Sequence, residues 1–488
     1  MSKNISPEME AVQAKRREAA REKWRGRFAK WSWNFVLAEA FLLALYPPAG
    51  TAALIIATVL TILRFRTDKE FKFRQLPFDV PAAIFVLLSG LSIIVSPDRG
   101  FSFYNWYNLV GVYVLTYFVV GQNLRSVQRV KELLLVIAMA AVFVLLYGFY
   151  QFAFGIDISS MKWVDGEAFP ELRKRVFSTW ENPNILAGYL DMIICLVFGL
   201  FIKSGTKQKR IVLGGLLAAG VACLAMTYAR GACLVIALIF ALYGMFKDWR
   251  VLLACTGVAV LLLVADPILY ERLSSVFTKV DTSSEMRLAF WESTVAMIQD
   301  HPFLGIGWGA YWMVYPEYDF YLQGADVRIV HAHNMYLNYA AEIGVPGMLA
   351  LMWLFFGSLV LALRQKFLPP APVISEPTPF DYNEEAAADV ELKKVADSVQ
   401  VPEEKPMTPI WQDFCQWADW RLLSGAALGL GLALISVALN GFTDDLLFNI
   451  PTSMFLWMLL AFVAAVAELN SKQEANDEES NNNIEGDH

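Results

Sequence analysis

Residues 132–154 read ELLLVIAMAAVFVLLYGFYQFAF, and Glu132 is the single charged residue in this stretch. A helix that crosses a bilayer needs about 20 mainly apolar residues, and this stretch supplies them. The whole chain is 56% hydrophobic and only 18% charged, whereas roughly a quarter of a soluble domain is charged. Similar apolar blocks recur at residues 31–48, 50–64, 78–96, 103–121, 132–154, 184–203, 210–228, 229–246, 250–266, 346–364, 421–440 and 449–468. The sequence therefore predicts an all-α integral membrane protein with about twelve transmembrane helices.

Basic residues predict the orientation of these helices. If the N-terminus lies inside and the spans alternate, most of the 40 lysines and arginines fall on the cytoplasmic side. The short loops at 64–74, 125–131, 203–210 and 247–250 are then all inside and all basic. We therefore expect a multi-pass protein with both termini in the cytoplasm. The basic N-terminus should be retained and should face lipid headgroups rather than nucleic acid.

Polar segments separate the apolar blocks, and two of the segments expected outside the membrane are long. The net charge of −7 comes largely from acidic segments near the C-terminus. Five cysteines are present, four of them inside apolar blocks, so neither disulfides nor a cysteine metal site is expected. No nucleotide-binding glycine loop occurs, and no cofactor is expected.

The expected order of segments begins with a basic cytoplasmic N-terminus at 1–30. Transmembrane helices one to nine follow at 31–266, with an external loop at 155–183, and a large helical external loop at 267–345 separates spans nine and ten. Helix ten at 346–364 leads into a mostly disordered cytoplasmic linker at 365–420, which ends in an interfacial helix with Trp411, Phe414, Trp417 and Trp420. Helices eleven and twelve at 421–468 and a disordered acidic tail at 469–488 complete the order.

A few arginines lie outside, where the positive-inside bias disfavours them. Arg230 stands between two apolar blocks, Arg175 precedes the sixth block, and Arg287 lies in the large loop. A charge at the membrane edge costs several kcal/mol unless it reaches the surface or lines a hydrated cavity. Arg230 is therefore either a topological anchor or an anion ligand, and the presence of several outside arginines favours the second reading.

The large loop contains helix signals. Thr282 to Glu285 forms a capping box, and the spacing of Leu288, Trp291, Val295 and Ile298 predicts one apolar helix face, fit to lie on the membrane or on the spans. The glycine-rich stretch 300–309 should end this helix, with His301 as a turn residue.

A second histidine segment follows at residues 331–347. Asn334 can cap a short helix, Gly344 can end it, and Pro346 can begin the next one. His333 then lies at a helix N-terminus on the outer membrane face. His331 and His333 have no carboxylate or cysteine close by in the sequence, so we expect a general base here rather than a metal site.

Three stretches together resemble one known family, the O-antigen ligases and the related O-antigen polymerases. They are His333-Asn334 followed by Gly344-Val-Pro-Gly347, Ser178 to Gly188, and Arg287 to Gly309. The resemblance covers residues 30–365 and the last two spans. Ala229 departs from the pattern because the family often has a small hydroxyl residue there, and the linker at 365–420 is not a feature of the family core.

The resemblance implies a GT-C-like, metal-independent, inverting glycosyltransferase of the bacterial cytoplasmic membrane, active on its outer face. The donor is a glycan on undecaprenyl pyrophosphate, and the acceptor is a hydroxyl of a glycolipid or another glycan, such as lipid A–core in lipopolysaccharide biosynthesis. His333 is expected to be the base, Arg230 and Arg287 the pyrophosphate ligands, and Arg175 a weaker third. The expected supporting residues are Asn334, His331, Asn182 and Gly344.

Three alternatives stay open. A polymerase would lengthen lipid-linked repeat units by the same chemistry, and a protein acceptor is also possible. A transporter or flippase would also suit about twelve spans. However, the apolar blocks hold few charges, mainly Glu39 and Asp191, and a carrier has no need of a large outer loop with histidines and arginines. We therefore favour ligase-type transfer.

Overall fold

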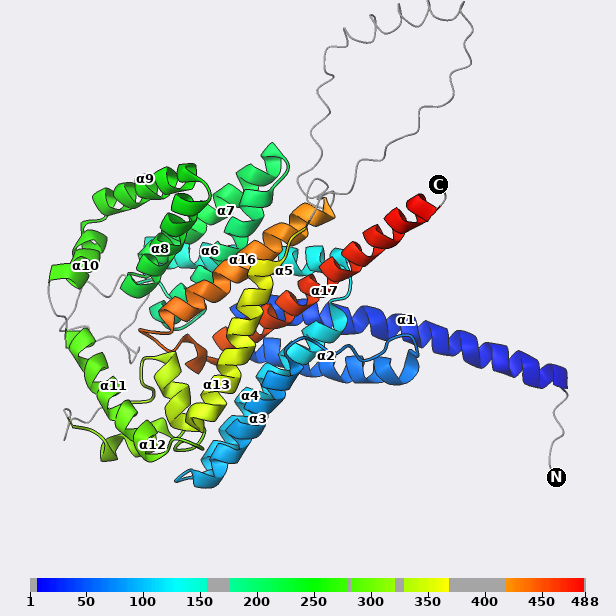
Figure 1. Ribbon diagram of the computed structural model, residues 1–488, viewed down its shortest axis with the longest axis horizontal. Helices are drawn as coiled ribbons and strands as arrows, with labels where there is room; N and C mark the ends of the chain where they lie inside the picture. The colour runs from blue at the N-terminus through cyan, green and yellow to red at the C-terminus, as the bar shows by residue number, and fades with distance from the viewer. Residues whose placement is uncertain (1–6, 156–174, 279–281, 321–328, 368–417, 487–488) are drawn as a thin grey trace, which may run out of the picture.

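The computed structural model describes residues 7–155, 175–278, 282–320, 329–367 and 418–486, which form helices and short connections (Figure 1). No strand occurs among these residues, so the predicted all-α class is confirmed. The helices are α1 Pro7–Leu45, α2 Pro47–Thr67, α3 Asp79–Ser92, η1 Ile93–Val95, α4 Arg99–Asn123, α5 Val127–Phe154, α6 Pro183–Lys203, α7 Lys207–Met226, α8 Arg230–Phe246, α9 Trp249–Ala265, α10 Pro267–Thr278, α11 Thr282–Asp300, α12 Tyr311–Val314, η3 Tyr315–Glu317, α13 Met335–Arg364, α16 Asp419–Asn440, η4 Leu446–Phe448 and α17 Ile450–Gly486.

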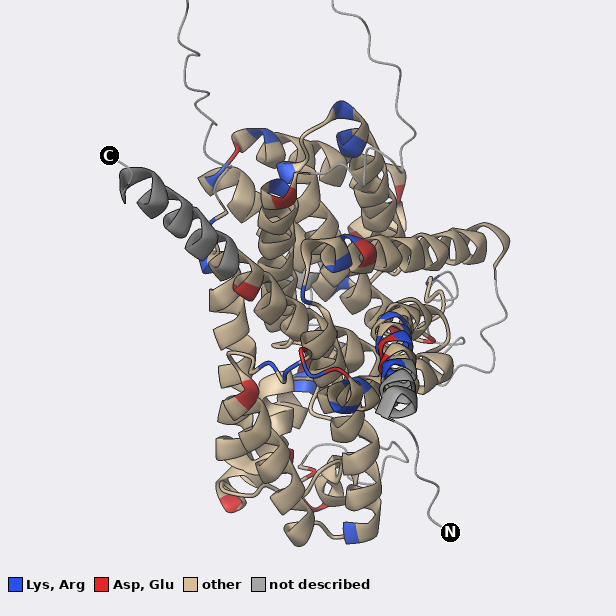
Figure 2. Ribbon diagram, turned by 90° about the vertical axis from the view of Figure 1, so that its right-hand side faces the viewer, with Lys and Arg blue, Asp and Glu red and all other residues tan. Residues whose placement is uncertain are grey.

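Each predicted apolar block overlaps one of these helices. Within the described residues, seven are long and apolar enough to cross a membrane, namely α2, α5, α6, α7, α13, α16 and the part of α17 up to Ser471. The helices at Asp79–Val95, Arg230–Phe246 and Trp249–Ala265 are apolar but shorter. Figure 2 shows long stretches of these helices without any charged residue. These lengths and compositions are those of a membrane protein, whereas the number of twelve spans remains a prediction.

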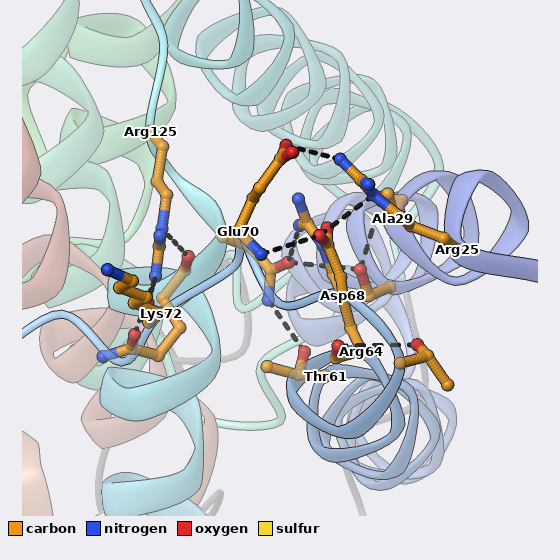
Figure 3. Close-up of polar contacts among 12 residues, drawn as sticks. Arg25, Ala29, Thr61, Arg64, Asp68, Glu70, Lys72 and Arg125 are labelled. Atoms are coloured by element: carbon orange, nitrogen blue, oxygen red, sulfur yellow. Dashed lines mark hydrogen bonds and ion pairs between the residues drawn. The ribbon is translucent and has the colours of Figure 1, made fainter. Parts of the chain in front are cut away.

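Several helix ends meet in a cluster of ion pairs, at what we call the basic end of the bundle. Arg25 of α1 contacts Asp68 at 2.9 Å, just after α2 (Figure 3). Arg74 and Glu468 are 3.0 Å apart, and Lys131 and Asp419 are 2.9 Å apart. These contacts bring the connection after α2, the start of α5, the start of α16 and the apolar part of α17 to the same end of the molecule.

The central contact of the bundle is the crossing of α6 and α16. A Cβ atom added to Gly199 would lie 2.3 Å from the backbone nitrogen of Gly429 and 2.4 Å from the carbonyl oxygen of Gly425. Only glycine permits this approach, which is the small-residue packing typical of helices in membranes. Near the other end of the crossing, Asn440 donates a hydrogen bond to Asp191 at 2.8 Å. The beginning of α6 and the end of α16 are therefore fixed side by side, at what we call the site end.

A glycine-rich turn packs against a kink in α13 at the site end. Gly344 has a φ of 74° and is non-helical, so α13 consists of two helices that meet there, as the sequence predicts. The backbone N–H of Ile306 donates to Ala341 at 2.8 Å, and that of Gly307 donates to Glu342 at 3.0 Å. A Cβ on Gly344 would lie 2.2 Å from the carbonyl oxygen of Phe303. The turn between α11 and α12 thus holds the first part of α13 in place.

The apolar face that the sequence predicts on α11 packs on the rest of the molecule in part, through Trp291 and Ile298. Leu288 is 58% exposed and Val295 is 41% exposed, whereas Phe290, Thr294 and Met297 are buried. Thr294 belongs to the buried face, where a bond between its hydroxyl and the Tyr311 hydroxyl at 2.8 Å satisfies its polar group.

Two polar segments differ in how far the structure describes them. The tail at 469–488 was expected to be disordered, but α17 continues helical to Gly486. Its lysine, glutamine, glutamate and alanine residues are good helix formers, which accounts for the continuation. The predicted interfacial helix with Trp411, Phe414 and Trp417 lies outside the described residues, as does most of the linker.

The glycine crossing makes a stability prediction. We expect Gly199→Ala to lower the thermal unfolding temperature of the detergent-solubilised protein, because overpacking of a tight contact costs about 1–3 kcal/mol. Gly215→Ala in α7 is the matched control, since a Cβ there has nothing within 4 Å. Unfolding followed by fluorescence-detected size-exclusion chromatography measures both variants. Equal melting temperatures would contradict the packing argument.

Candidate active site

His333 and Asp444 form a hydrogen-bonded pair at the site end. The Nδ1 atom of His333 lies 3.2 Å from Oδ1 of Asp444, which follows the end of α16. Phe290 of α11 stacks on the imidazole with ring centroids 5.9 Å apart. Burial opposes ionisation of the Asp444 carboxyl, but the hydrogen bond with His333 and the electrostatic effects of His333, His331 and, least, Arg287 outweigh it and lower its pKa to about 2. Asp444 is therefore a carboxylate at neutral pH.

The segment that carries His333 is fixed on both sides. The backbone N–H of His333 donates to Nδ1 of His331 at 3.1 Å, and burial lowers the pKa of His331 to about 3, so this ring is a neutral acceptor. Asn334 caps α13 by accepting from the N–H of Leu337 at 3.0 Å, as predicted. Its amide also donates to the carbonyl of Phe442 at 3.1 Å. These bonds hold the imidazole against the turn that contains Asp444.

Three arginines that the sequence singles out line one pocket of about 140 Å³ beside this pair. Arg175 precedes α6, Arg230 is the first residue of α8, and Arg287 belongs to α11. Asp444 also lines the pocket and so connects it to His333. The fold thus brings arginines from three separate segments together with Asp444, which is hydrogen-bonded to His333. Two larger apolar grooves, of about 660 and 600 Å³, lie along the helices and have almost entirely apolar linings, so we assign the chemistry to the smaller pocket.

The pocket arginines are held by defined contacts. Arg175 donates to the carbonyl of Thr227 at 2.7 Å and to the side-chain oxygen of Asn184 at 2.6 Å. Tyr228 has a φ of 51°, and its hydroxyl bonds Asp266 at 2.6 Å. This bond ties the turn before Arg230 to the start of α10.

The N-terminus of α8 adds to the positive potential. Ala229 is the N-cap residue and provides no side-chain cap. Arg230, Gly231 and Ala232 make up the first turn of the helix and line the pocket. The N–H groups at the start of a helix and the helix dipole both favour an anion. Guanidinium groups and helix terminus together make this pocket suitable for a polyanion such as a diphosphate.

The remaining predicted residues lie around the pocket rather than in it. Asn182 caps α6 by accepting from the N–H of Asn184 at 2.8 Å, and Gly344 forms the α13 kink. His301 is exposed at the end of α11, as expected for a turn residue. Sequence reasoning missed Asn184 and Asp444. The available signal for Asp444 was the acidic pair Asp444-Asp445 in a short loop that the alternation of spans places outside.

Comparison with known proteins agrees with the resemblance found in the sequence. Residues 213–352 match the family model described as O-antigen ligase, a range that includes Arg230, Arg287 and His333. This match supports the resemblance of this part of the chain to the O-antigen ligase and polymerase family. No curated protein matched the chain.

The pocket makes a binding prediction. Inorganic pyrophosphate should raise the melting temperature of the purified protein, because an anion that binds only the folded state stabilises it. Arg230→Gln should reduce this shift, since it removes one of the three guanidinium groups. Arg99→Gln is the control, because Arg99 is exposed and does not line the pocket. The assignment fails if both variants keep the full shift at equal ionic strength.

Proposed function

We propose that this member of the O-antigen ligase and polymerase family transfers a glycan from undecaprenyl pyrophosphate to an acceptor hydroxyl, on the outer face of the bacterial cytoplasmic membrane. The observation that carries the proposal is the single pocket lined by Arg175, Arg230, Arg287 and Asp444, with His333 bonded to Asp444. The reaction forms a glycosidic bond to the acceptor oxygen. It breaks the bond between the anomeric carbon and the pyrophosphate oxygen, and the lipid pyrophosphate leaves with the bonding electrons.

The arginine pocket suits the leaving group. A pyrophosphate departs as a stable anion, so the site needs fixed positive charge more than a strong general acid. Arginine forks bind phosphate oxygens through two parallel bonds and cannot lose their protons. The first turn of α8 adds backbone donors. Charge that develops on the pyrophosphate oxygen therefore meets donors that are already in place.

The His333–Asp444 pair suits activation of the acceptor. We assign the Nδ1 proton of His333 to the bond with Asp444, which leaves the Nε2 lone pair to take the proton of the attacking hydroxyl. The Asp444 carboxylate then stabilises the imidazolium, as a buried carboxylate does in hydrolytic triads. Inversion requires the hydroxyl to attack from the side opposite the pyrophosphate.

The distribution of charge supports the proposed sidedness. The basic end holds Arg25, Arg74 and Lys131, and the positive-inside rule places such an end in the cytoplasm. Both termini would then be cytoplasmic, and the site end would face outward, where lipid-linked glycans and their acceptors meet.

A transporter fits the described structure less well. The buried carboxylates Glu39 and Asp191 accept hydrogen bonds inside the bundle, from Thr116 at 2.8 Å and from Asn440 at 2.8 Å. One oxygen of each side chain is thus bonded within the bundle, whereas Oε2 of Glu39 and Oδ1 of Asp191 are buried without a hydrogen-bond partner among the described residues, so the expectation of satisfied contacts is met only in part. The concentration of arginines, histidines and Asp444 in one pocket favours transfer chemistry instead.

The catalytic assignment predicts graded losses of activity. In cells that lack the native gene, His333→Ala should reduce glycan attachment about 10²–10⁴-fold, the usual contribution of a general base. Asp444→Asn should reduce it about 10- to 100-fold, because a hydrogen bond to a charged group contributes roughly 1.5–3 kcal/mol. His301→Ala, on an exposed turn, is the control at matched expression. Normal attachment with both His333→Ala and Arg230→Ala would rule the assignment out.

The choice of acceptor distinguishes a ligase from a polymerase. Purified protein incubated with a lipid-linked glycan and a separate lipid A–core acceptor should produce glycosylated acceptor. Longer lipid-linked chains without acceptor modification would instead indicate a polymerase. A glycosylated protein among the products would indicate a protein acceptor.

A further inference from the structure

We propose that His331, His333 and Asp444 form a binding site for a divalent transition metal such as Zn²⁺, and that the bound metal inhibits the enzyme. Among the described residues, these three side chains offer ligand atoms that all lie within 4.8 Å of one another. The binding step stands on this geometry alone, whereas the inhibition rests on the proposed role of His333 as the base.

The three side chains have the composition of a metal site. Two imidazoles and one carboxylate are a common ligand set for zinc, which binds them at about 2.0–2.2 Å. Tetrahedral ligands at that distance lie about 3.4 Å apart, and the His333 and Asp444 atoms are already 3.2 Å apart. The two imidazole rings have centroids 4.1 Å apart and are tilted by 54°. Metal binding would draw the three ligand atoms, which lie within 4.8 Å of one another, to that spacing and would leave one tetrahedral position open.

The surroundings of the cluster select the type of ion. Arg175, Arg230 and Arg287 line the adjoining pocket, and their charge opposes any cation. Mg²⁺ and Ca²⁺ bind mainly through oxygen ligands and charge, and this site supplies one carboxylate beside three guanidinium groups. Zn²⁺, Co²⁺ and Cu²⁺ gain from the two imidazole nitrogen donors, so they overcome the repulsion where the hard ions do not.

A metal at this position would block the proposed reaction directly. Nδ1 is the atom of His333 that faces Asp444. An ion bound there takes the Nδ1 lone pair, so the neutral ring must carry its proton on Nε2. The Nε2 atom then has no lone pair to accept the proton of the acceptor hydroxyl. The ion also separates the imidazole from the carboxylate that stabilises its charged form.

The experiment adds Zn²⁺ or Co²⁺ alone to the purified full-length protein in lipid nanodiscs. We expect one ion per chain at this site, and a Co²⁺ absorption spectrum without thiolate charge-transfer bands. The key variant is His331→Asn, because asparagine retains an acceptor for the His333 backbone N–H but is a poor zinc ligand. His301→Ala is the control, since this histidine is exposed on a different turn. His331→Asn should weaken binding and raise the half-inhibitory Zn²⁺ concentration about tenfold or more.

Each outcome decides one of the two proposals. Inhibition that a chelator reverses, with Mg²⁺ inactive and His331→Asn resistant, supports the metal site. Equal Zn²⁺ binding by His331→Asn, His301→Ala and the unaltered protein would mean adventitious binding and would overturn it. Glycan transfer without stoichiometric Co²⁺ binding would also overturn it and would leave the proposed function intact. Specific Co²⁺ binding by a protein that transfers no glycan would overturn the proposed function alone.

Discussion

The close crossing of α6 and α16 is the contact on which the site depends. Gly199 and Gly429 bring the two backbones together where a Cβ would collide, and a Cβ on Gly425 would be a tight contact. One end of this crossing places Asn184 beside the turn that carries Asp444, and Asn184 in turn holds Arg175. The start of α8 and the His333 segment then pack around these ends through bonds to Thr227, Gly441 and Phe442. A polar pocket at the end of a membrane bundle thus derives its geometry from an apolar contact inside the bundle.

Electrostatics explains why a single carboxylate lies among so many cations. Three guanidinium groups in a pocket of about 140 Å³ repel one another, and Asp444 neutralises part of that charge when no anion is bound. The same carboxylate holds His333 through a hydrogen bond. A bound pyrophosphate would provide the remaining negative charge, so the arginines are arranged for a ligand that carries more than one charge. In this proposal Asp444 links donor binding to acceptor activation, because one side chain contacts both parts of the site.

The sequence predicted the helices well because a membrane span can be recognised from the hydrophobicity and length of one continuous stretch of residues. Apolar blocks located α5, α6 and α16, and cap and glycine signals located Asn334 and the Gly344 kink. The three arginines were also found, since each violates the positive-inside bias. Asp444 was missed because it lies 111 residues from His333 and its local sequence resembles an ordinary polar turn. The burial of Thr294 on α11 could not be predicted from hydrophobic spacing, because it depends on a hydrogen bond to Tyr311.

Backbone strain gathers around the same site. Among the described residues, the non-glycine residues with positive φ are Ser178, Glu181, Tyr228 and His333. Two lie between Arg175 and Asn184, one lies two residues before Arg230, and the fourth is the proposed base. Such conformations cost about 1–3 kcal/mol each and persist only where the surroundings impose them. Here the Ser178 N–H donates to Gln151 at 2.7 Å, Tyr228 bonds Asp266, and the His333 N–H donates to His331. In the proposed reaction these strained turns would hold the guanidinium and imidazole groups in place before substrate binds, which is the condition under which fixed charges stabilise a transition state most effectively.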